Sequence, residues 1–204
     1  MSLRPTLSIP LLAILLVSAG CTILPESERS TLYRLPTSDS ASIRSPSSTT
    51  VPLRLGVATP EAGHLLSSNR IVVYPERNVV NVYAGTRWHE DAPDMLQARL
   101  ISGLQQRQLF ASVGSDRLPN DVLLLSELRH FQSEYDATPP SAHIQLDVQL
   151  VGGQNRQPIT AKSFTTRAQA SSVDIPDVVD AFGRASDELT EQLATWLAEQ
   201  ARLL

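Results

Sequence analysis

The chain has 204 residues, 42% of them apolar, and a formal net charge of −4. This length and composition favour one folded domain of ordinary size. A mildly acidic chain without a basic run lacks the electrostatic footprint of a nucleic-acid-binding protein, so nucleic acid is excluded as a partner. The single cysteine excludes an internal disulfide.

The first residues have the layout of a secretory signal peptide. Arg4 precedes an apolar stretch, residues 7–17, which is shorter than the roughly 20 residues that a membrane-spanning helix needs. Residues 18–21, Ser-Ala-Gly-Cys, resemble a bacterial lipoprotein lipobox, although an aliphatic residue is usual at the first of these positions. In such signals cleavage falls between the glycine and the cysteine, here Gly20 and Cys21, and the cysteine carries the lipid. An ordinary signal peptide, cleaved or uncleaved, is the alternative.

The segment after the cysteine predicts a tether. Residues 36–52 are rich in Ser, Thr and Pro, which cannot bury enough apolar surface to fold alone. We therefore predict a signal peptide over 1–20, a lipidated N-terminus and tether over 21–52, and one globular domain over 53–204. The thirty residues from Cys21 to Val51 would span roughly 30 Å as a relaxed coil. Within this region the alternation in residues 31–35, TLYRL, predicts a short strand on this domain or on a neighbour's edge.

Alternating apolar and polar residues predict most of the sheet. Such alternation indicates strands over residues 53–58, 122–135, 142–152 and 158–171. Residues 70–85 form two β-rich runs around Pro-Glu-Arg-Asn and predict a hairpin. A meander of this kind buries one face and leaves the other in water.

Two longer segments predict amphipathic helices. Residues 91–110 begin with Asp91 near the cap and Pro93 in the first turn, and residues 176–203 carry apolar side chains at three- and four-residue steps. The second apolar stripe is better explained as core than as a binding surface. We therefore predict an α/β (α+β) sandwich, a mixed and largely antiparallel sheet with two main helices packed on it.

Few residues carry recognisable chemistry. The sequence has no Gly-x-Ser-x-Gly elbow, phosphate-binding glycine loop or His-Glu-x-x-His helix. His130 and His143 lie on strands predicted to pair across a turn, where they form either a cross-strand polar pair or, as the alternative, a metal site. Glu127 and Glu134 are read as solvated carboxylates. We predict no catalytic residue, no metal site and no cofactor, only the covalent lipid (palmitate among its acyl chains) on Cys21.

A family resemblance comes from the order of these features. Residues 64–104 couple a hairpin, a tryptophan, an Asp/Pro helix start and a leucine-striped helix. Together with the lipobox and the TLYRL strand, this order resembles the ABC-type transport auxiliary lipoproteins, the PqiC-like family. The resemblance implies an anticodon-binding-domain-like sandwich and a non-enzymatic protein anchored in the outer membrane and facing the periplasm. It implies work with a periplasmic MCE-domain protein and an ABC permease in lipid transport, and assembly as a homo-oligomer.

The resemblance also implies contact residues. Tyr33 and Leu35 would belong to the ordered part of the chain, and Trp88 would sit where the hairpin meets the helix. All three are candidate contacts with a partner or a second subunit, and for Trp88 a core plug is the alternative. Two other functions stay open at this point, an outer-membrane assembly or secretion lipoprotein that binds a β-barrel and a periplasmic hydrolase. Thr22, after the cysteine, favours outer over inner membrane.

Overall fold

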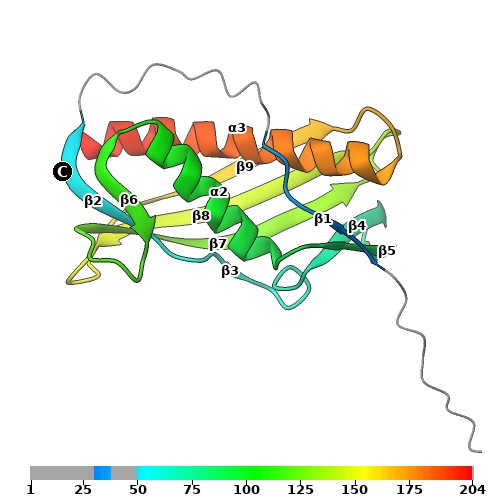
Figure 1. Cartoon of the computed structure of the whole chain (residues 1–204), viewed down its shortest axis with the longest axis horizontal. Helices are drawn as coiled ribbons and strands as arrows, with labels where there is room; N and C mark the ends of the chain where they lie inside the picture. Colours follow the sequence, from blue (N-terminus) through cyan, green and yellow to red (C-terminus); the bar gives the residue numbers. More distant parts are fainter. Residues whose placement is uncertain (1–29, 38–49, 204) are drawn as a thin grey trace, which may run out of the picture.

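The computed structural model describes residues 30–37 and 50–203 (Figure 1). Within these two ranges the chain forms nine strands and two helices. The strands are β1 (Thr31–Tyr33), β2 (Val51–Val57), β3 (Glu61–Ala62), β4 (Arg70–Glu76), β5 (Val79–Trp88), β6 (Phe110–Ser115), β7 (Val122–Glu134), β8 (Ser141–Gly152) and β9 (Pro158–Gln169), and the helices are α2 (Ala92–Gln106) and α3 (Ile175–Ala201).

Strand β7 is the central strand of the sheet and pairs along both of its edges. Along one edge it pairs antiparallel with β8, which in turn pairs antiparallel with β9. Its other edge is shared by three short strands, β2, β3 and β4, which pair with it in parallel one after another. Strand β6 extends the sheet from β2, and β5 followed by β1 extends it from β4. The longest ladders are antiparallel, as predicted, and the short parallel ladders complete a mixed, open sheet.

Both helices cover the same face of the sheet (Figure 1). Helix α3 packs on β8 and β9, and α2 packs on β6, β2 and α3. The apolar stripe of α3 is buried, including Phe182, Leu189 and Leu193 at 0% exposure, and it joins the core of the sheet. Phe131 of β7 lies 4.9 Å from Phe182, centroid to centroid, which fixes the core between the two layers. The predicted two-layer fold is confirmed, and the α3 stripe is core.

The end of α2 differs from the prediction. The helix begins after Asp91 with a proline in its first turn, as the sequence indicates. It ends at Gln106, four residues before the predicted end, because Gln108 adopts a φ of 51° in the left-handed region. Leu109 is buried just beyond the helix, and the chain then enters β6, a strand that the sequence analysis did not predict.

Neither helix in the described residues is long and apolar enough to cross a bilayer. Helix α3 has the length, with 27 residues, but only one side of it is apolar. That side is occupied by the sheet, where Trp196 meets Phe164 edge to face at 5.8 Å.

Candidate functional site

The part of the N-terminal region that the structure describes before β2 lies on the domain. We refer to residues 30–37 as the docked segment. Strand β1 pairs in parallel with the end of β5, with Tyr33 in register with Trp88. The backbone N–H of His89 donates to the carbonyl of Tyr33 at 2.9 Å. The strand predicted from TLYRL therefore exists and belongs to this domain's own sheet.

Beyond β1 the docked segment contacts both helices. The guanidinium of Arg99 on α2 donates to the carbonyl of Pro36 at 3.1 Å, and it also forms an ion pair with Asp187 of α3. A Cβ added to Gly183 of α3 would lie 2.7 Å from Cγ and 2.8 Å from the carbonyl oxygen of Pro36. Only a residue without a side chain allows the segment to lie this close to α3.

A groove of about 570 Å³ runs beside the docked segment. Its walls come from the segment itself, from α2 and from the first turns of α3. Leu35, Met95 and Val179 make part of the lining apolar, and Arg34 and Asp180 bring charges of both signs to it. An apolar lining with mixed charges suits the docking of a peptide or another amphipathic ligand.

The predicted contact residues occupy different environments. Tyr33 and Leu35 are partly buried, pack against the core and line the groove. Trp88 is fully buried, with its ring 5.9 Å from that of Phe131 and 5.2 Å from that of Phe182, both edge to face. This burial favours the core-plug alternative for Trp88, because a side chain with no accessible surface offers nothing to a partner. The predicted cleavage and lipidation positions, Gly20 and Cys21, lie outside the described residues.

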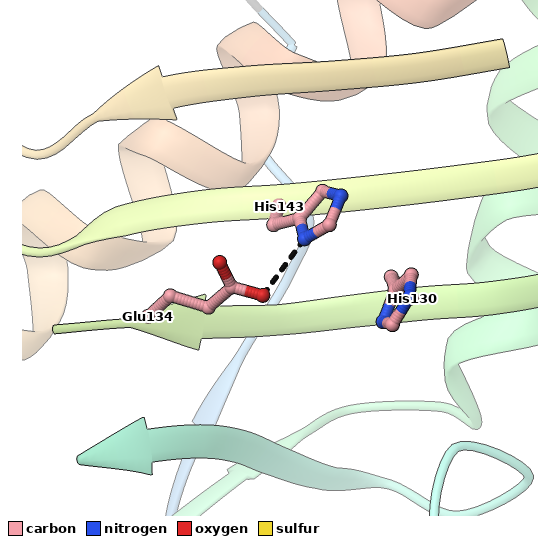
Figure 2. A group of neighbouring side chains, drawn as sticks. All are labelled: His130, Glu134 and His143. Atoms are coloured by element: carbon pink, nitrogen blue, oxygen red, sulfur yellow. Dashed lines mark hydrogen bonds and ion pairs between the residues drawn. The ribbon is translucent and has the colours of Figure 1, made fainter. Parts of the chain in front are cut away.

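A second site lies on the face of the sheet opposite the helices. We call it the polar cluster and define it as His130, Gln132 and Glu134 of β7, His143 of β8 and Arg167 of β9. Gln132, His143 and Arg167 are aligned across the three strands. Figure 2 shows His130 and Glu134 on β7 and His143 on the adjacent strand.

A β-bulge places the histidine of β7 in this cluster. Leu128 pairs with Leu146 and His130 with Gln145, so Arg129 is the extra residue of β7. The bulge shifts the alternation by one residue, and His130 therefore points to the polar face instead of the core. The sequence carries a signal for it, since Leu128 and Phe131 are both core residues but are three positions apart.

Short hydrogen bonds connect the members of the polar cluster. Glu134 Oε1 lies 2.7 Å from Nδ1 of His143 and accepts from Nε2 of Gln132 at 2.9 Å, while Oε2 forms an ion pair with Arg167 at 2.7 Å. The amide of Gln132 also lies 2.8 Å from Nδ1 of His130. The rings of the two histidines are stacked, with centroids 4.7 Å apart and planes 17° from parallel.

The cluster changes the acidity of its members. Burial lowers the pKa of His130, and the neighbouring His143 lowers it further. Burial alone would raise the pKa of Glu134, but hydrogen bonds from His143 and Gln132 and the charge of Arg167 outweigh it, and the pKa lies below its ordinary value. At neutral pH the carboxylate of Glu134 is therefore ionised and the ring of His130 is neutral.

The sequence predicts only part of this cluster. The two histidines are expected near each other, which the structure confirms. Glu134 is expected to be a solvated carboxylate, but its side chain is only 12% exposed. Glu127 is the more exposed of the two and pairs with Arg129. Gln132 and Arg167 were not predicted. The period-two spacing of His130, Gln132 and Glu134 on one strand was the available signal.

Comparison with known proteins assigns this chain to a protein family. Residues 33–194 match the family described as ABC-type transport auxiliary lipoprotein component. The chain belongs to this family. The match begins inside the docked segment and ends within α3, so it covers every residue that lines the groove.

Solved structures share the fold of this auxiliary lipoprotein. One is the crystal structure of a Xanthomonas campestris protein of the family DUF330, 28% identical, with a TM-score of 0.74, covering 85% of this chain and 98% of that one. Another, described only as an uncharacterized protein, is 17% identical with a TM-score of 0.67, covering 83% and 99% of the two chains, and it supports the fold alone. No curated protein is significantly similar in sequence.

Proposed function

We propose that this auxiliary lipoprotein is a non-enzymatic component of an MCE/ABC-type system that moves lipids between the inner and outer membranes. It is held in the outer membrane by acyl chains on Cys21 and faces the periplasm. The single observation that carries the proposal is the match of residues 33–194 to a family of lipoproteins that assist ABC-type transport. The lipobox-like residues 18–21 agree with it.

The docked segment sets how far the domain can lie from such an anchor. Only eight residues, 22–29, lie between Cys21 and Ser30, where the segment begins. Fully extended, the nine steps from Cys21 to Ser30 reach about 30 Å. The sequence had suggested a tether ending at residue 52, which would reach on the order of 100 Å when extended. The lipid would therefore keep the β1 edge of the sheet near the membrane surface, and the rest of the domain would extend into the periplasm.

The groove beside the docked segment is the surface that we assign to a protein partner. Tyr33 and Leu35 line it together with residues of both helices, so a partner bound there would contact the N-terminal region and the domain at once. Its apolar lining and mixed charges suit a segment of the MCE protein or of a second copy of this chain. Such a protein would position the other components of the system and would perform no bond chemistry.

The test is affinity capture of the full-length protein from membranes, through a tag at the C-terminus, with mass spectrometry of the captured proteins and of the N-terminal peptide. An acylated Cys21 together with an MCE protein and an ABC permease supports both the anchor and the role. A β-barrel protein captured without ABC components would replace the proposal with the assembly or secretion alternative. An unmodified Cys21 refutes the anchor.

Two matched variants sharpen this experiment. Cys21→Ala removes the predicted lipid site, and we expect the protein to leave the membrane fraction while its domain stays folded. Leu35→Asp puts a charge into the groove, and we expect it to reduce capture of the partner without changing acylation. Leu118→Asp is the control, because Leu118 is an exposed leucine that does not line the groove.

A further inference from the structure

Three side chains of the polar cluster have the arrangement of metal ligands. One ligand atom from each of His130, Glu134 and His143 lies within 4.8 Å of the others. They converge because His130 and Glu134 flank Gln132 on the same face of β7, and His143 of β8 lies directly opposite Gln132. Two neighbouring strands thus supply two imidazoles and one carboxylate to one point on the sheet (Figure 2).

The ligand types select the kind of metal. Two imidazole nitrogens and one carboxylate oxygen are typical of Zn²⁺ sites, whereas Ca²⁺ and Mg²⁺ prefer oxygen ligands alone. At Zn–ligand distances of about 2.1 Å, tetrahedral ligand atoms lie about 3.4 Å apart. Oε1 of Glu134 and Nδ1 of His143 are closer than this, at 2.7 Å, and no two of the three ligand atoms are more than 4.8 Å apart. Rotation of the side chains of His130 and Glu134 about their χ angles would bring all three atoms to the tetrahedral spacing.

The residues that hydrogen-bond to these three side chains are also compatible with metal binding. Oε2 of Glu134 is held by Arg167, which leaves Oε1 directed at His143. Carboxylates that bind a metal are commonly fixed by an outer hydrogen bond of this kind. The side chain of Arg167 is 47% exposed, so water screens its positive charge from a cation bound at Oε1. Gln132 donates to both His130 and Glu134, and its amide must give way to the metal.

Without a metal, two contacts compete for Nδ1 of His143. Its Nδ1 lies 2.7 Å from a carboxylate oxygen of Glu134, which requires a donor, and 3.1 Å from the guanidinium of Arg167, which requires an acceptor. One nitrogen cannot be both. A metal ion bound between Nδ1 and the carboxylate oxygen would use the lone pair of each.

We propose that His130, Glu134 and His143 bind a divalent transition-metal ion of the Zn²⁺ type on the face of the sheet opposite the helices. The ion links β7 to β8 and leaves a fourth coordination position open to water or to a side chain of another protein. This site is separate from the groove and does not depend on the proposed role in transport.

The experiment is calorimetric titration of ZnCl₂ into the full-length protein, purified in detergent with a tag free of histidine and treated with a chelator. We expect the wild type to bind one Zn²⁺ per chain. His130→Gln and Glu134→Gln should each weaken binding by at least about tenfold. His64→Gln is the control, because His64 is exposed and outside the cluster, and it should bind like the wild type. With Co²⁺ in place of Zn²⁺, we expect a tetrahedral visible spectrum that is lost in His130→Gln.

Two results would overturn the proposal. One is a wild-type protein that binds no stoichiometric Zn²⁺, and the other is unchanged affinity in both cluster variants. Glu134→Gln also removes an ion pair, so its fold is checked by circular dichroism without metal. His130 lies at the partly exposed edge of the cluster, and His130→Gln therefore decides the question if Glu134→Gln does not fold.

Discussion

Replacing Gly183 by alanine tests how the docked segment is held against α3. The new Cβ would lie 2.7 Å from Cγ of Pro36 and 2.8 Å from its carbonyl oxygen, and ordinary contact begins at 3.4 Å. Pro36 must therefore move by about 0.6–0.7 Å. One of the two atoms belongs to the backbone, so a change of side-chain rotamer cannot relieve the clash.

Two opposing effects set the free-energy change that Gly183→Ala causes. Alanine is favoured over glycine inside a helix by about 1 kcal/mol, whereas overpacking costs about 1–3 kcal/mol. The chain avoids the overpacking by releasing the segment, which loses the bond from Arg99 to Pro36 and that from His89 to Tyr33. Each such bond contributes about 1 kcal/mol. We expect a local opening of residues 33–37 that is about 5–30 times more populated, with little change in global stability.

Hydrogen–deuterium exchange with peptide-level mass spectrometry measures this opening, and urea unfolding measures global stability. Gly103→Ala is the matched control, because a Cβ there meets the buried side chain of Thr190 on α3. It has the same helix-propensity gain but strains the contact between the helices, so it should lower global stability and leave exchange at 33–37 unchanged. Wild-type exchange at these residues in Gly183→Ala would refute the reasoning.

Three further predictions concern the fold. Trp88→Ala should destabilise the protein by about 3–5 kcal/mol in urea unfolding because it empties a fully buried site; a loss below about 1 kcal/mol would contradict the core-plug role. The guanidinium of Arg54 holds the pKa of Asp121 at about 2, below the ordinary 3.8. The ionised Asp121 therefore stabilises the folded protein at pH values above 3.8, and this stabilisation is lost as the pH falls through about 2. Asp121→Asn should therefore be less stable than wild type at pH 7, with a difference that shrinks below pH 4; a difference independent of pH would count against the pair. Thr166→Val should cost about 1 kcal/mol in the same unfolding assay, because it removes a buried hydroxyl that donates to the carbonyl of Ala185 on α3, and an unchanged urea midpoint would show that this bond contributes nothing.

Periodic burial made the larger elements predictable from sequence. Residues 142–152 alternate cleanly because one face of β8 lies on the core and the other is polar, and α3 carries its apolar stripe for the same reason. Strand β6 was missed because only Phe110 and Val113 are buried in it, and their spacing fits a helix better than a strand. The two-residue β3 is too short to produce a pattern.

Features that depend on distant partners were not predictable. The parallel pairing of β2, β3 and β4 with β7 joins residues far apart in the chain, and no local pattern encodes it. The polar cluster depends on the bulge at Arg129 and on the register of β9, which brings Arg167 to His143. The two histidines were placed together only because the turn between their strands was recognised. Glu134 and Arg167 could be placed beside them only once the register of β7, β8 and β9 was known.

The order of the strands along β7 affects how the domain folds as the chain is made. Among the described residues, β3 pairs only with β7, and β2 pairs only with β6 and β7, all of which come later in the chain. Arg54 in the middle of β2 bonds to Asp121, the residue before β7, and the two are 67 residues apart. Because synthesis proceeds from the N-terminus, β2 and β3 stay unpaired until the second half of the chain arrives. Any chaperone that protects such edges would act on this chain before residue 122 emerges.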